Sequence, residues 1–473
     1  MGQSDEGQPG ILRNPLNAYG GPDPWLTYYE GNYYLATTTG TSELTMRTSS
    51  TLAGLKIAVP VQIYFETDSS RCCNMWAPEF HLLDGPNGMR WYYYYSAGTA
   101  GTLDNQHTHV LESTGTDPMG PYTYKGRLYD AQNDTWAIDG SILKLDDAIY
   151  FLFSSWVGPN QSMFIAPMSD PWTLSGPRVL ISEPEYDWER VGLNVNEGPV
   201  ALYHDDNVFI VYSASYCATP DYKLGILTYT GDDPLSTDSW VKSPEPVFQR
   251  SDENSIFGPA HNGFFRSPDG TEDWIVYHAN DAESDGCDDG RTTHVQKFTW
   301  NEDGTPNFGV PVSITEDIAA PSGDMGVDPV PKFDQLVISR FESYGLRQNY
   351  ILHVETFARV IAASNVADSQ FYVMPGLADP EAVSIVSINL PGHYLRHQDN
   401  AIFFHLNDGA ENFSEDATWW IRPGLADSDW ISIESFNQPG MYIGRQFGVM
   451  ALVPLTETSP RIGLEDATFR EEN

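Results

Sequence analysis

The segment WAIDGSIL at residues 136–143 is followed closely by the aromatic run AIYFLFSSW at residues 148–156. This pairing of a short segment with an aromatic run recurs along the first two thirds of the chain. The other aromatic runs are YEGNYYLATT (29–38), RWYYYYSAG (90–98), NVFIVYSASY (207–216) and DWIVYHAN (273–280). Runs that are rich in aromatic and β-branched residues, and that are bounded by turn-forming residues, predict β-strands.

A polar residue lies just upstream of each aromatic run, in a segment that also contains Gly or Pro. The five segments are GPDPWL with Asp23, WAPEFHLL with Glu79, WAIDGSIL with Asp139, NEGPVALY with Glu197 and FGPAHNGFF with His261, at separations of 56, 60, 58 and 64 residues. A repeat of this length with several short strands per unit is typical of a β-propeller. The sequence therefore predicts five blades, each with its upstream segment as the innermost strand, and five polar groups that converge on the central axis.

A second repeat lies in the last third of the chain. FYVMPGLADPEAVSIVSINLPGHYL (371–395) aligns with WWIRPGLADSDWISIESFNQPGMYI (419–443) at an offset of 48 residues, and a degenerate earlier copy runs from Ser343 to His353. Three copies of short strands and turns predict a β-trefoil. We therefore expect an all-β chain with a five-bladed β-propeller at residues 1–315, a Pro- and Gly-rich linker at residues 316–333 and a β-trefoil at residues 334–473.

The composition agrees with an all-β protein and disfavours two classes of partner. Aromatic residues make up 13% of the chain, which also contains 40 Gly and 33 Pro. With 65 acidic against 25 basic residues the net charge is −40, and such a field repels phosphate. We therefore expect neither nucleic acid nor an anionic membrane as a partner, whereas a neutral polysaccharide meets no such repulsion. No apolar run is long enough to span a bilayer.

The cysteines and the glycosylation sequons suit a secreted chain. Three Asn-x-Ser/Thr sequons occur, at Asn133, Asn160 and Asn412. Cys217 and Cys287 follow two of the predicted strands, and we expect them to form a disulfide. For the adjacent pair Cys72 and Cys73, a vicinal bridge and two buried thiols are equally plausible. No cysteine pair has the spacing of a zinc site.

The converging polar residues supply three candidate catalytic carboxyl groups, Asp23, Asp139 and Glu197. Enzymes cleave glycosidic bonds with two carboxyl groups, one that protonates the leaving oxygen and one that activates water or attacks directly. Three carboxyl groups in one pocket repel each other, so one of them should have a raised pKa, as a general acid needs. The sequence therefore indicates glycoside hydrolysis.

These residues, in this order and spacing, resemble glycoside hydrolase family 43 over about residues 12–315. The resemblance implies that Asp23 is the general base, that Glu197 is the general acid, and that Asp139 orients the acid and tunes its pKa. It also implies inversion at the anomeric carbon, for which the two carboxyl groups of base and acid lie roughly 6.5–9.5 Å apart.

The same resemblance suggests roles for residues around the carboxylates. Trp76 stacks on the sugar or packs between blades, Arg291 hydrogen-bonds the sugar, and Phe257 lines the same pocket. Glu79 is expected to be a buried structural acid. No cofactor is required, but His261 corresponds to a position where a histidine contacts a water-coordinated cation, such as Ca²⁺ or Na⁺, at the axis; a hydrogen-bonded core histidine is the alternative.

The trefoil repeats resemble the arabinofuranose-binding module of carbohydrate-binding family 42. The matching features are PGLA at 375–378 and 423–426, LPGHYLRH ending at residue 397, and DAT at 416–418 and 466–468. In that family a His and an Asp hold the sugar in each lobe, and the pairs here are His353 with Asp368 and His397 with Asp416. The third lobe departs from the pattern, because Arg445 stands beside Asp466 where a histidine is expected. We therefore expect two working sugar sites.

The two resemblances together predict a secreted, monomeric, exo-acting α-L-arabinofuranosidase that releases L-arabinofuranose from the ends of α-1,5-linked arabinan. An alternative is an arabinofuranosidase that removes side chains from arabinoxylan. A hypothesis of another class is a non-catalytic protein in which both domains only bind sugar, and the complete set of three carboxylates argues against it.

Overall fold

The computed structural model describes residues 10–17, 21–56, 58, 60–287, 290–324, 338–354, 356–362, 367–390, 392–407, 412–446, 449–456 and 458–472. The chain divides into two compact units. The first comprises Met1–Ala58 with Gln62–Asp328, and the second comprises Val59–Val61 with Pro329–Asn473. Residues 325–333 of the expected linker lie outside the described residues.

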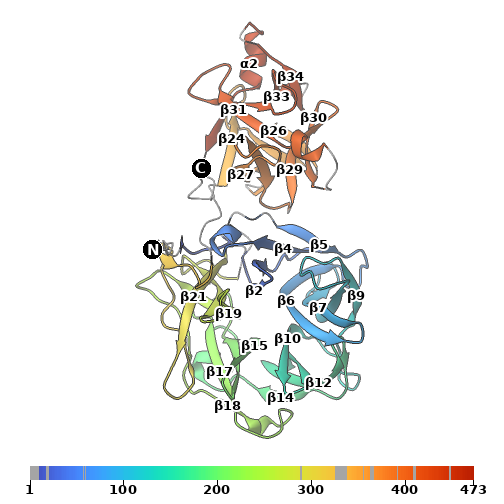
Figure 1. Ribbon diagram of the computed structural model, residues 1–473, viewed down its shortest axis with the longest axis vertical. Helices are drawn as coiled ribbons and strands as arrows, with labels where there is room; N and C mark the ends of the chain where they lie inside the picture. Colours follow the sequence, from blue (N-terminus) through green and yellow to red (C-terminus); the bar gives the residue numbers. More distant parts are fainter. Residues whose placement is uncertain are drawn as a thin grey trace, which may run out of the picture. The chain divides into compact units, whose positions relative to one another are not determined.

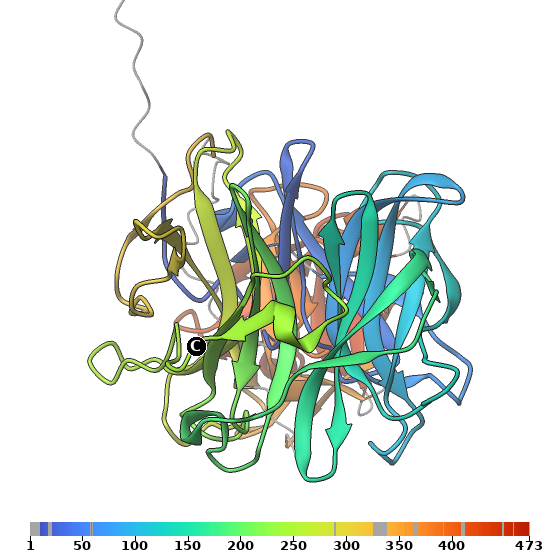
Figure 2. The same ribbon diagram turned by 90° about the horizontal axis from the view of Figure 1, so that it is seen from below.

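The first unit is a five-bladed β-propeller, as the repeat predicts. Each blade is an antiparallel sheet whose strands follow one another along the chain from the axis outward. The blades are β2 (Trp25–Tyr29), β3 (Asn32–Ala36), β4 (Glu43–Ser49) and β5 (Val61–Phe65); β6 (Cys73–Gly85), β7 (Gly88–Gly98), β8 (His107–Ser113) and β9 (Tyr122–Arg127); β10 (Ile138–Leu145), β11 (Ala148–Val157), β12 (Asn160–Asp170), β13 (Thr173–Leu174) and β14 (Val179–Ser182); β15 (Asn196–His204), β16 (Asn207–Ala214), β17 (Lys223–Tyr229) and β18 (Trp240–Lys242); and β19 (Phe257–Arg266), β20 (Asp273–Asn280), β21 (Thr292–Trp300) and β22 (Pro306–Asn307). Figure 1 shows β2, β6, β10, β15 and β19 as the inner ring, and Figure 2 shows the blades from the side.

The N-terminal segment closes the ring by bonding to the last blade. Strand β1 (Ile11–Leu12) pairs with β23 (Ile318–Ala319), so part of the expected linker belongs to the propeller. The side chain of Asn14 donates a hydrogen bond to the carbonyl oxygen of Val295 and accepts one from its N–H, both at 2.9 Å. Because Asn14 is buried, these two bonds satisfy backbone groups that water cannot reach.

The propeller has no single core, since each junction between neighbouring blades buries its own apolar cluster. The aromatic runs supply these clusters: Trp25, Trp91 and Tyr93 pack between blades 1 and 2, and Phe151 and Phe153 pack between blades 2 and 3. Similar clusters lie at the other three junctions. The alternation of side chains along a strand sends neighbouring residues to opposite junctions, which explains why the runs are apolar on both faces.

Each innermost strand contains or follows a residue in the left-handed region of backbone space at an equivalent position. These residues are Asp23, Ala77, Asp139, Gly198 and His261, with φ values of 51°, 46°, 57°, 55° and 46°. In blades 2 to 5 the pairing register shifts at this residue, which marks a β-bulge. The bulges lie where the innermost strands reach the axis and re-aim the local side chains, so they define the candidate site.

At four of the junctions, the backbone N–H of the left-handed residue donates a hydrogen bond to a side chain of the preceding blade. The N–H of Ala77 donates to Thr38 Oγ1 at 2.7 Å, and the N–H of Asp139 donates to Ser96 Oγ at 3.1 Å. The N–H of His261 donates to Ser213 Oγ at 2.8 Å. At the junction of blades 5 and 1 the acceptor is the Nδ1 atom of His278, 3.1 Å from the N–H nitrogen of Asp23.

The junction of blades 3 and 4 uses a carboxylate instead. The hydroxyl of Ser154 occupies the position of Ser96 and Ser213, but it donates to the carbonyl oxygen of Asn196 at 2.9 Å. The N–H of Gly198 donates to Asp139 Oδ2 at 2.9 Å. The bulge of blade 4 is therefore held by one of the three acids that the sequence singles out.

The second unit is a β-trefoil of twelve strands in one closed sheet. Its first and last strands, β24 and β35, pair with each other, so the first repeat is completed by the C-terminus. The strands are β24 (Ile338–Ser343), β25 (Tyr350–Val354), β26 (Phe357–Ile361), β27 (Phe371–Pro375), β28 (Val383–Ser387), β29 (His393–Gln398), β30 (Ala401–Leu406), β31 (Trp419–Pro423), β32 (Ile431–Ser435), β33 (Met441–Gln446), β34 (Val449–Pro454) and β35 (Phe469–Glu472). Phe371, Trp419 and Phe469 occupy equivalent strands and meet in its core.

Short helices complete both units. They are η1 (Ala53–Lys56), η2 (Asp187–Glu189) and η3 (Thr237–Ser239) in the propeller, and η4 (Ala367–Ser369), α1 (Phe413–Asp416) and α2 (Arg461–Asp466) in the trefoil. Of the helices within the described residues, none has the length and apolar character needed to cross a membrane.

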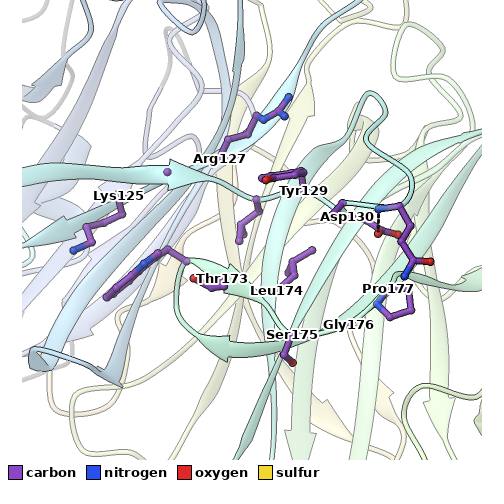
Figure 3. A pocket seen from close by; sticks show the side chains of 14 residues that line it. Lys125, Arg127, Tyr129, Asp130, Thr173, Leu174, Ser175, Gly176 and Pro177 are labelled. Carbon is purple, nitrogen blue, oxygen red and sulfur yellow. Dashed lines mark hydrogen bonds between the residues drawn. The ribbon is translucent and has the colours of Figure 1, made fainter.

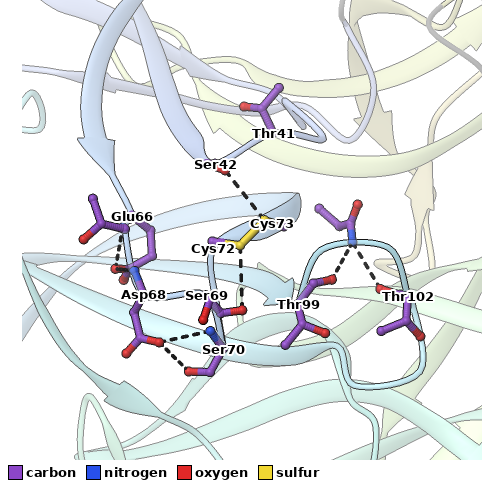
Figure 4. The surroundings of a disulfide bond; sticks show 12 residues. Thr41, Ser42, Glu66, Asp68, Ser69, Ser70, Cys72, Cys73, Thr99 and Thr102 are labelled. Carbon is purple, nitrogen blue, oxygen red and sulfur yellow. Dashed lines mark hydrogen bonds between the residues drawn. A yellow bond between two sulfur atoms is a disulfide. The ribbon is translucent and has the colours of Figure 1, made fainter.

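The four cysteines form two disulfides. Cys217 and Cys287 join the loops that follow β16 and β20. Cys72 and Cys73 form a vicinal bridge at the start of β6, which decides between the two alternatives that the sequence leaves open (Figure 4). The hydroxyl of Ser42, from blade 1, lies 3.7 Å from Cys73 Sγ. The bridge thus lies where loops of blades 1 and 2 run together.

We expect Asn14→Ala to destabilise the propeller by about 1–3 kcal/mol, because it leaves the buried N–H and carbonyl of Val295 without partners. Urea unfolding followed by tryptophan fluorescence measures this change. Gln132→Ala, at an exposed position, is the matched control and should alter stability by less than about 0.5 kcal/mol. Equal stability of the two variants would show that Asn14 does not close the ring.

Candidate active site

The three carboxylates of the sequence analysis meet at the propeller axis. Asp23 precedes β2, Asp139 lies on β10 and Glu197 lies on β15. Asp23 and Asp139 are buried, and Glu197 keeps partial exposure. The charge of Asp23 acts on both of the other acids, and the charge of Glu197 acts on Asp139. The sequence therefore identified one cluster of acids from three different blades.

Asp23 is surrounded by donors and positive charge. Its Oδ2 atom accepts a hydrogen bond from Thr38 Oγ1 at 2.6 Å, and its Oδ1 atom accepts one from Arg291 at 3.1 Å. Burial alone would raise the pKa of Asp23, but His261 and Arg291 outweigh it and hold this pKa well below its usual range. Burial also lowers the pKa of His261, so at neutral pH the fixed charge comes from Arg291. Asp23 is ionised, as a general base must be.

At Glu197, in contrast, the effect of burial outweighs the effect of the hydrogen-bond donors. Tyr222 donates its hydroxyl hydrogen to Oε1 at 2.9 Å, and Gln161 donates to Oε2 at 2.6 Å. Removal from bulk water raises the pKa of Glu197 to about 7, although these two hydrogen bonds lower it in part. The charge of Asp23 raises it further. A carboxyl group that retains its proton near neutral pH is suited to general acid catalysis.

Asp139 interacts electrostatically with both of these acids. Burial raises the pKa of Asp139 well above its usual range, and the charges of Glu197 and Asp23 add to this effect. The N–H of Gly198 opposes it, because a hydrogen bond to the carboxylate stabilises the ionised form. Asp139 and Glu197 therefore cannot both ionise readily, and the pair retains a proton near neutral pH.

The other propeller residues of the sequence analysis lie around this cluster in different ways. Arg291 binds Asp23 directly, in addition to any contact with sugar. Trp76, on β6, is half-buried, and it occupies the position in blade 2 that Glu197 occupies in blade 4. Phe257 begins β19, and the guanidinium of Arg250 lies 5.0 Å from its ring centre. Glu79 lies two residues beyond the bulge of its blade, is buried, and bonds His81 at 2.8 Å.

His261 offers one ligand for the cation that the resemblance suggests. Its Nδ1 atom lies 3.4 Å from Asp23 Oδ1. Within the described residues no group of three or more His, Cys, Asp or Glu side chains could hold a metal ion. The cation stays a prediction.

The first two trefoil lobes contain the expected histidine and aspartate, with an asparagine between them. His353 Nε2 lies 2.8 Å from Asn389 Oδ1, and Asn389 Nδ2 donates to Asp368 Oδ1 at 2.8 Å. The second lobe repeats this chain with His397, Asn437 and Asp416, again at 2.8 Å for both contacts.

The second lobe also borders a cavity of about 760 Å³. The lining includes His397 and Asp416, together with Arg396, which donates to Asp416 Oδ2 at 2.8 Å. The polar side chains of this lobe are thus oriented by one another and accessible to a sugar.

The third lobe differs at two positions. Arg445 replaces the histidine and forms an ion pair with Asp466 at 2.7 Å. Gly345 occupies the position of Asn389 and Asn437, and a Cβ atom there would lie 3.2 Å from Asp466 Oδ1. The arginine therefore pairs with the carboxylate that the other lobes orient through an asparagine, and the expectation of two sugar sites stays a prediction.

A further cavity, of about 670 Å³, lies on the outer wall of the propeller beside β9 and β13 (Figure 3). Its lining includes Trp172 and Lys125 and none of the three carboxylates. Lys125 covers the ring of Trp172 at 4.1 Å, and Tyr92 packs against the same ring. Side chains of the propeller thus already contact this tryptophan, and the cavity is separate from the acids at the axis.

Comparison with known proteins agrees with this geometry. The family described as "Glycosyl hydrolases family 43" matches residues 12–306, which is more than half of the chain. The chain belongs to this family. The "Alpha-L-arabinofuranosidase B (ABFB) domain" matches residues 339–471, so both resemblances drawn from the sequence are confirmed. The protein is a glycoside hydrolase of the inverting type, in a family whose members need no cofactor for catalysis.

Several relatives are similar over most of the chain. An extracellular exo-α-(1→5)-L-arabinofuranosidase from Streptomyces avermitilis is 37% identical over 86% of this chain and 81% of its own length. Alpha-L-arabinofuranosidase 43 from Humicola insolens is 34% identical over 77% of this chain and 74% of its own. The crystal structure of an α-L-arabinofuranosidase from Lactobacillus brevis has a TM-score of 0.60 at 34% identity, and covers 64% of this chain and 98% of its own.

Sequence reasoning missed several residues of the family 43 site and of the trefoil. Asn389 and Asn437 were recognisable, because they recur at the 48-residue offset in SINLPG and SFNQPG. Gln161 and Tyr222 both bond Glu197. Gln161 lies at the start of β12, and Tyr222 lies just before β17. Both positions are outside the repeated segments, so no pattern marked them. The repeat did contain a signal for His278, because the other blades have Ser or Thr at this position of the aromatic run.

We expect Tyr222→Phe to move the alkaline limb of the pH profile of kcat/KM to higher pH. In the native protein this limb should lie near pH 7, because activity requires Glu197 to be protonated. The hydroxyl of Tyr222 lowers this pKa, so its removal should raise it, with a loss of less than about tenfold in kcat at the optimum. Conversely, Asp139→Asn should shift the limb to lower pH, because it removes a neighbouring negative charge. A limb that both variants leave unmoved would contradict the assignment of Glu197.

We expect the double variant Gly345→Asn with Arg445→His to create a third sugar site in the trefoil. It restores the two side chains that bond the aspartate in the other lobes. Isothermal titration calorimetry with an arabinofuranosyl oligosaccharide, on an E197Q background, should change from two sites to three. His397→Ala is the matched control and should leave one site. Unchanged stoichiometry in the double variant would show that the His–Asn–Asp chain is not sufficient for binding.

Proposed function

We propose that this protein is an extracellular, exo-acting α-L-arabinofuranosidase that releases L-arabinofuranose from the ends of α-1,5-linked arabinan. The observation that carries the proposal is the opposite ionisation of two acids in one pocket, Asp23 below and Glu197 above its usual pKa. Family membership supports glycoside hydrolysis. The printed activities of the Streptomyces and Humicola proteins support arabinofuranose as the sugar.

The two acids divide the reaction between them. Glu197 gives its proton to the glycosidic oxygen as the bond between that oxygen and the anomeric carbon breaks. Asp23 takes a proton from a water molecule whose oxygen attacks the same carbon from the opposite face. The products are a free hydroxyl on the shortened chain and arabinose of inverted configuration, with the proton now on Asp23 and the charge on Glu197. Asp139 keeps Glu197 protonated between turnovers.

The trefoil supplies a second contact with the polymer. Its first two lobes hold sugar through His353 with Asp368 and through His397 with Asp416. Binding to two sites on one chain raises the effective concentration of the substrate at the propeller without changing the chemical step. This division of labour suits an insoluble cell-wall polysaccharide outside the cell, which is where the Streptomyces relative acts by its name. We propose that the protein acts as a monomer.

A product profile tests the proposal and separates it from the alternatives. Linear α-1,5-arabino-oligosaccharides and debranched arabinan should yield arabinose as the first and main product. Preferential release from arabinoxylan would instead indicate a side-chain arabinofuranosidase. Binding of either polymer without any release of arabinose would indicate a protein that only binds sugar, and would overturn the proposal.

We expect Glu197→Gln and Asp23→Asn each to lower kcat by at least about a hundredfold on arabino-oligosaccharides, because each removes one proton transfer. Gln132→Ala, at an exposed position away from the acids, is a control that should retain activity. Proton NMR of the first product should detect β-L-arabinofuranose, the inverted anomer. Retention of configuration, or a loss of less than tenfold at either acid, would refute the assigned roles.

A further inference from the structure

The junction between blades 5 and 1 differs from the others in the side chain that accepts the bulge hydrogen bond. A hydroxyl accepts this bond at three junctions, from Thr38, Ser96 and Ser213. At the junction of blades 5 and 1 the acceptor is an imidazole, the Nδ1 atom of His278. The residue that it holds is Asp23. Holding a backbone N–H does not by itself require an imidazole, since a hydroxyl performs the same task elsewhere in this propeller.

His278 lies close to the side chain of Asp23 as well as to its backbone. Its Nδ1 atom lies 3.1 Å from the backbone nitrogen of Asp23 and 3.3 Å from Oδ1 of the same residue. His278 is 1% exposed. The rings of Tyr222 and His261 lie nearly parallel to it, with centroids at 5.7 and 6.0 Å, and restrict the tilt of its plane. A ring restricted in this way, with one atom beside both groups of Asp23, can orient the carboxylate as well as the backbone.

The hydrogen bond determines which nitrogen of His278 carries the proton. An atom that accepts from an N–H has no hydrogen of its own, so Nδ1 is unprotonated and the proton of the neutral ring lies on Nε2. Nδ1 therefore cannot donate to Oδ1, and its lone pair repels that oxygen toward the guanidinium of Arg291, 3.1 Å away.

A serine or threonine in this place would behave differently. Its hydroxyl could accept the N–H and at the same time donate to Oδ1. That extra hydrogen bond would occupy a lone pair of the base and make it a weaker proton acceptor. The unprotonated Nδ1 atom fixes the backbone of Asp23 without adding this hydrogen bond to Oδ1.

We propose that His278 is a positioning residue for the general base: its Nδ1 atom holds the backbone of Asp23 and turns the carboxylate toward Arg291 without donating to it. The proposal rests on the role of Asp23 in the proposed function. Its tests are therefore chosen so that failure of the one is distinguishable from failure of the other.

Two substitutions separate the structural task of His278 from the positioning task. His278→Ser restores the hydroxyl used by the other blades, and should keep Tm within about 2 °C of the native protein. His278→Ala removes the acceptor, and should lower Tm by about 2–4 °C. In both variants kcat should fall by at least about tenfold, with KM within about twofold, because the chemical step is affected and sugar binding is not. Rescue of Tm without rescue of kcat is the expected signature.

Substrates with different leaving groups test whether the loss of kcat in His278→Ser arises at the base. An aryl arabinofuranoside with an acidic leaving group needs little protonation by Glu197, whereas it still needs a base to activate water. His278→Ser should therefore lower kcat about equally on the aryl substrate and on an arabino-oligosaccharide. Tyr222→Phe, which acts on Glu197, should have the smaller effect on the aryl substrate.

Three results would overturn the proposal. Native kcat in His278→Ser would show that a hydroxyl suffices. A raised KM with native kcat would show that His278 only shapes the sugar pocket. Protonation of Nδ1 would show that this atom can donate to the carboxylate. ¹⁵N NMR of histidine-labelled protein measures the protonation of both ring nitrogens, and His278→Ser assigns the signal. It should find Nδ1 unprotonated and Nε2 protonated near neutral pH. This last measurement needs no activity. Lack of arabinose release by the native protein would instead refute the proposed function.

Discussion

The hydrogen bond that holds the left-handed residue of each innermost strand sets the geometry of the propeller axis. It fixes a backbone conformation that residues with a Cβ atom rarely adopt, and so it decides where the first side chain of each strand points. At the junction of blades 3 and 4 the acceptor is Asp139, and at the junction of blades 5 and 1 it is His278. Both exceptions lie beside the acids that we assign to catalysis. The same interaction that assembles the blades therefore positions the chemistry.

Electrostatics then distinguishes carboxylates that are alike in chemistry. Burial disfavours the charged form of all three. The groups around Asp23, above all His261 and Arg291, outweigh burial there and favour ionisation. Glu197 receives neutral donors from Tyr222 and Gln161, which do not compensate for burial. The two acids thus differ in ionisation because different groups surround them.

In the trefoil, the closure of the sheet determines which residues meet in the third lobe. The third lobe includes the start of the first repeat, because β24 and β35 pair. The residue at the position of the bridging asparagine in this lobe is therefore Gly345. The arginine at position 445 then reaches Asp466 directly. The first two lobes keep both the histidine and the asparagine. Threefold symmetry of the fold therefore does not give three equivalent lobes, since two differing residues, far apart in the sequence, meet in one lobe.

The sequence by itself determined the two folds, the three acids and the His–Asp pairs, because repeats and local motifs are periodic features that a single chain displays. It assigned Glu79 and Glu197 to equivalent positions, whereas the bulges place Ala77 and Gly198 there. Only the tertiary structure identified His278 and Tyr222 as partners of the base and the acid. The reason is physical: the pKa and orientation of a carboxylate depend on groups a few ångströms away, and the closed ring of blades brings those groups together from distant parts of the chain.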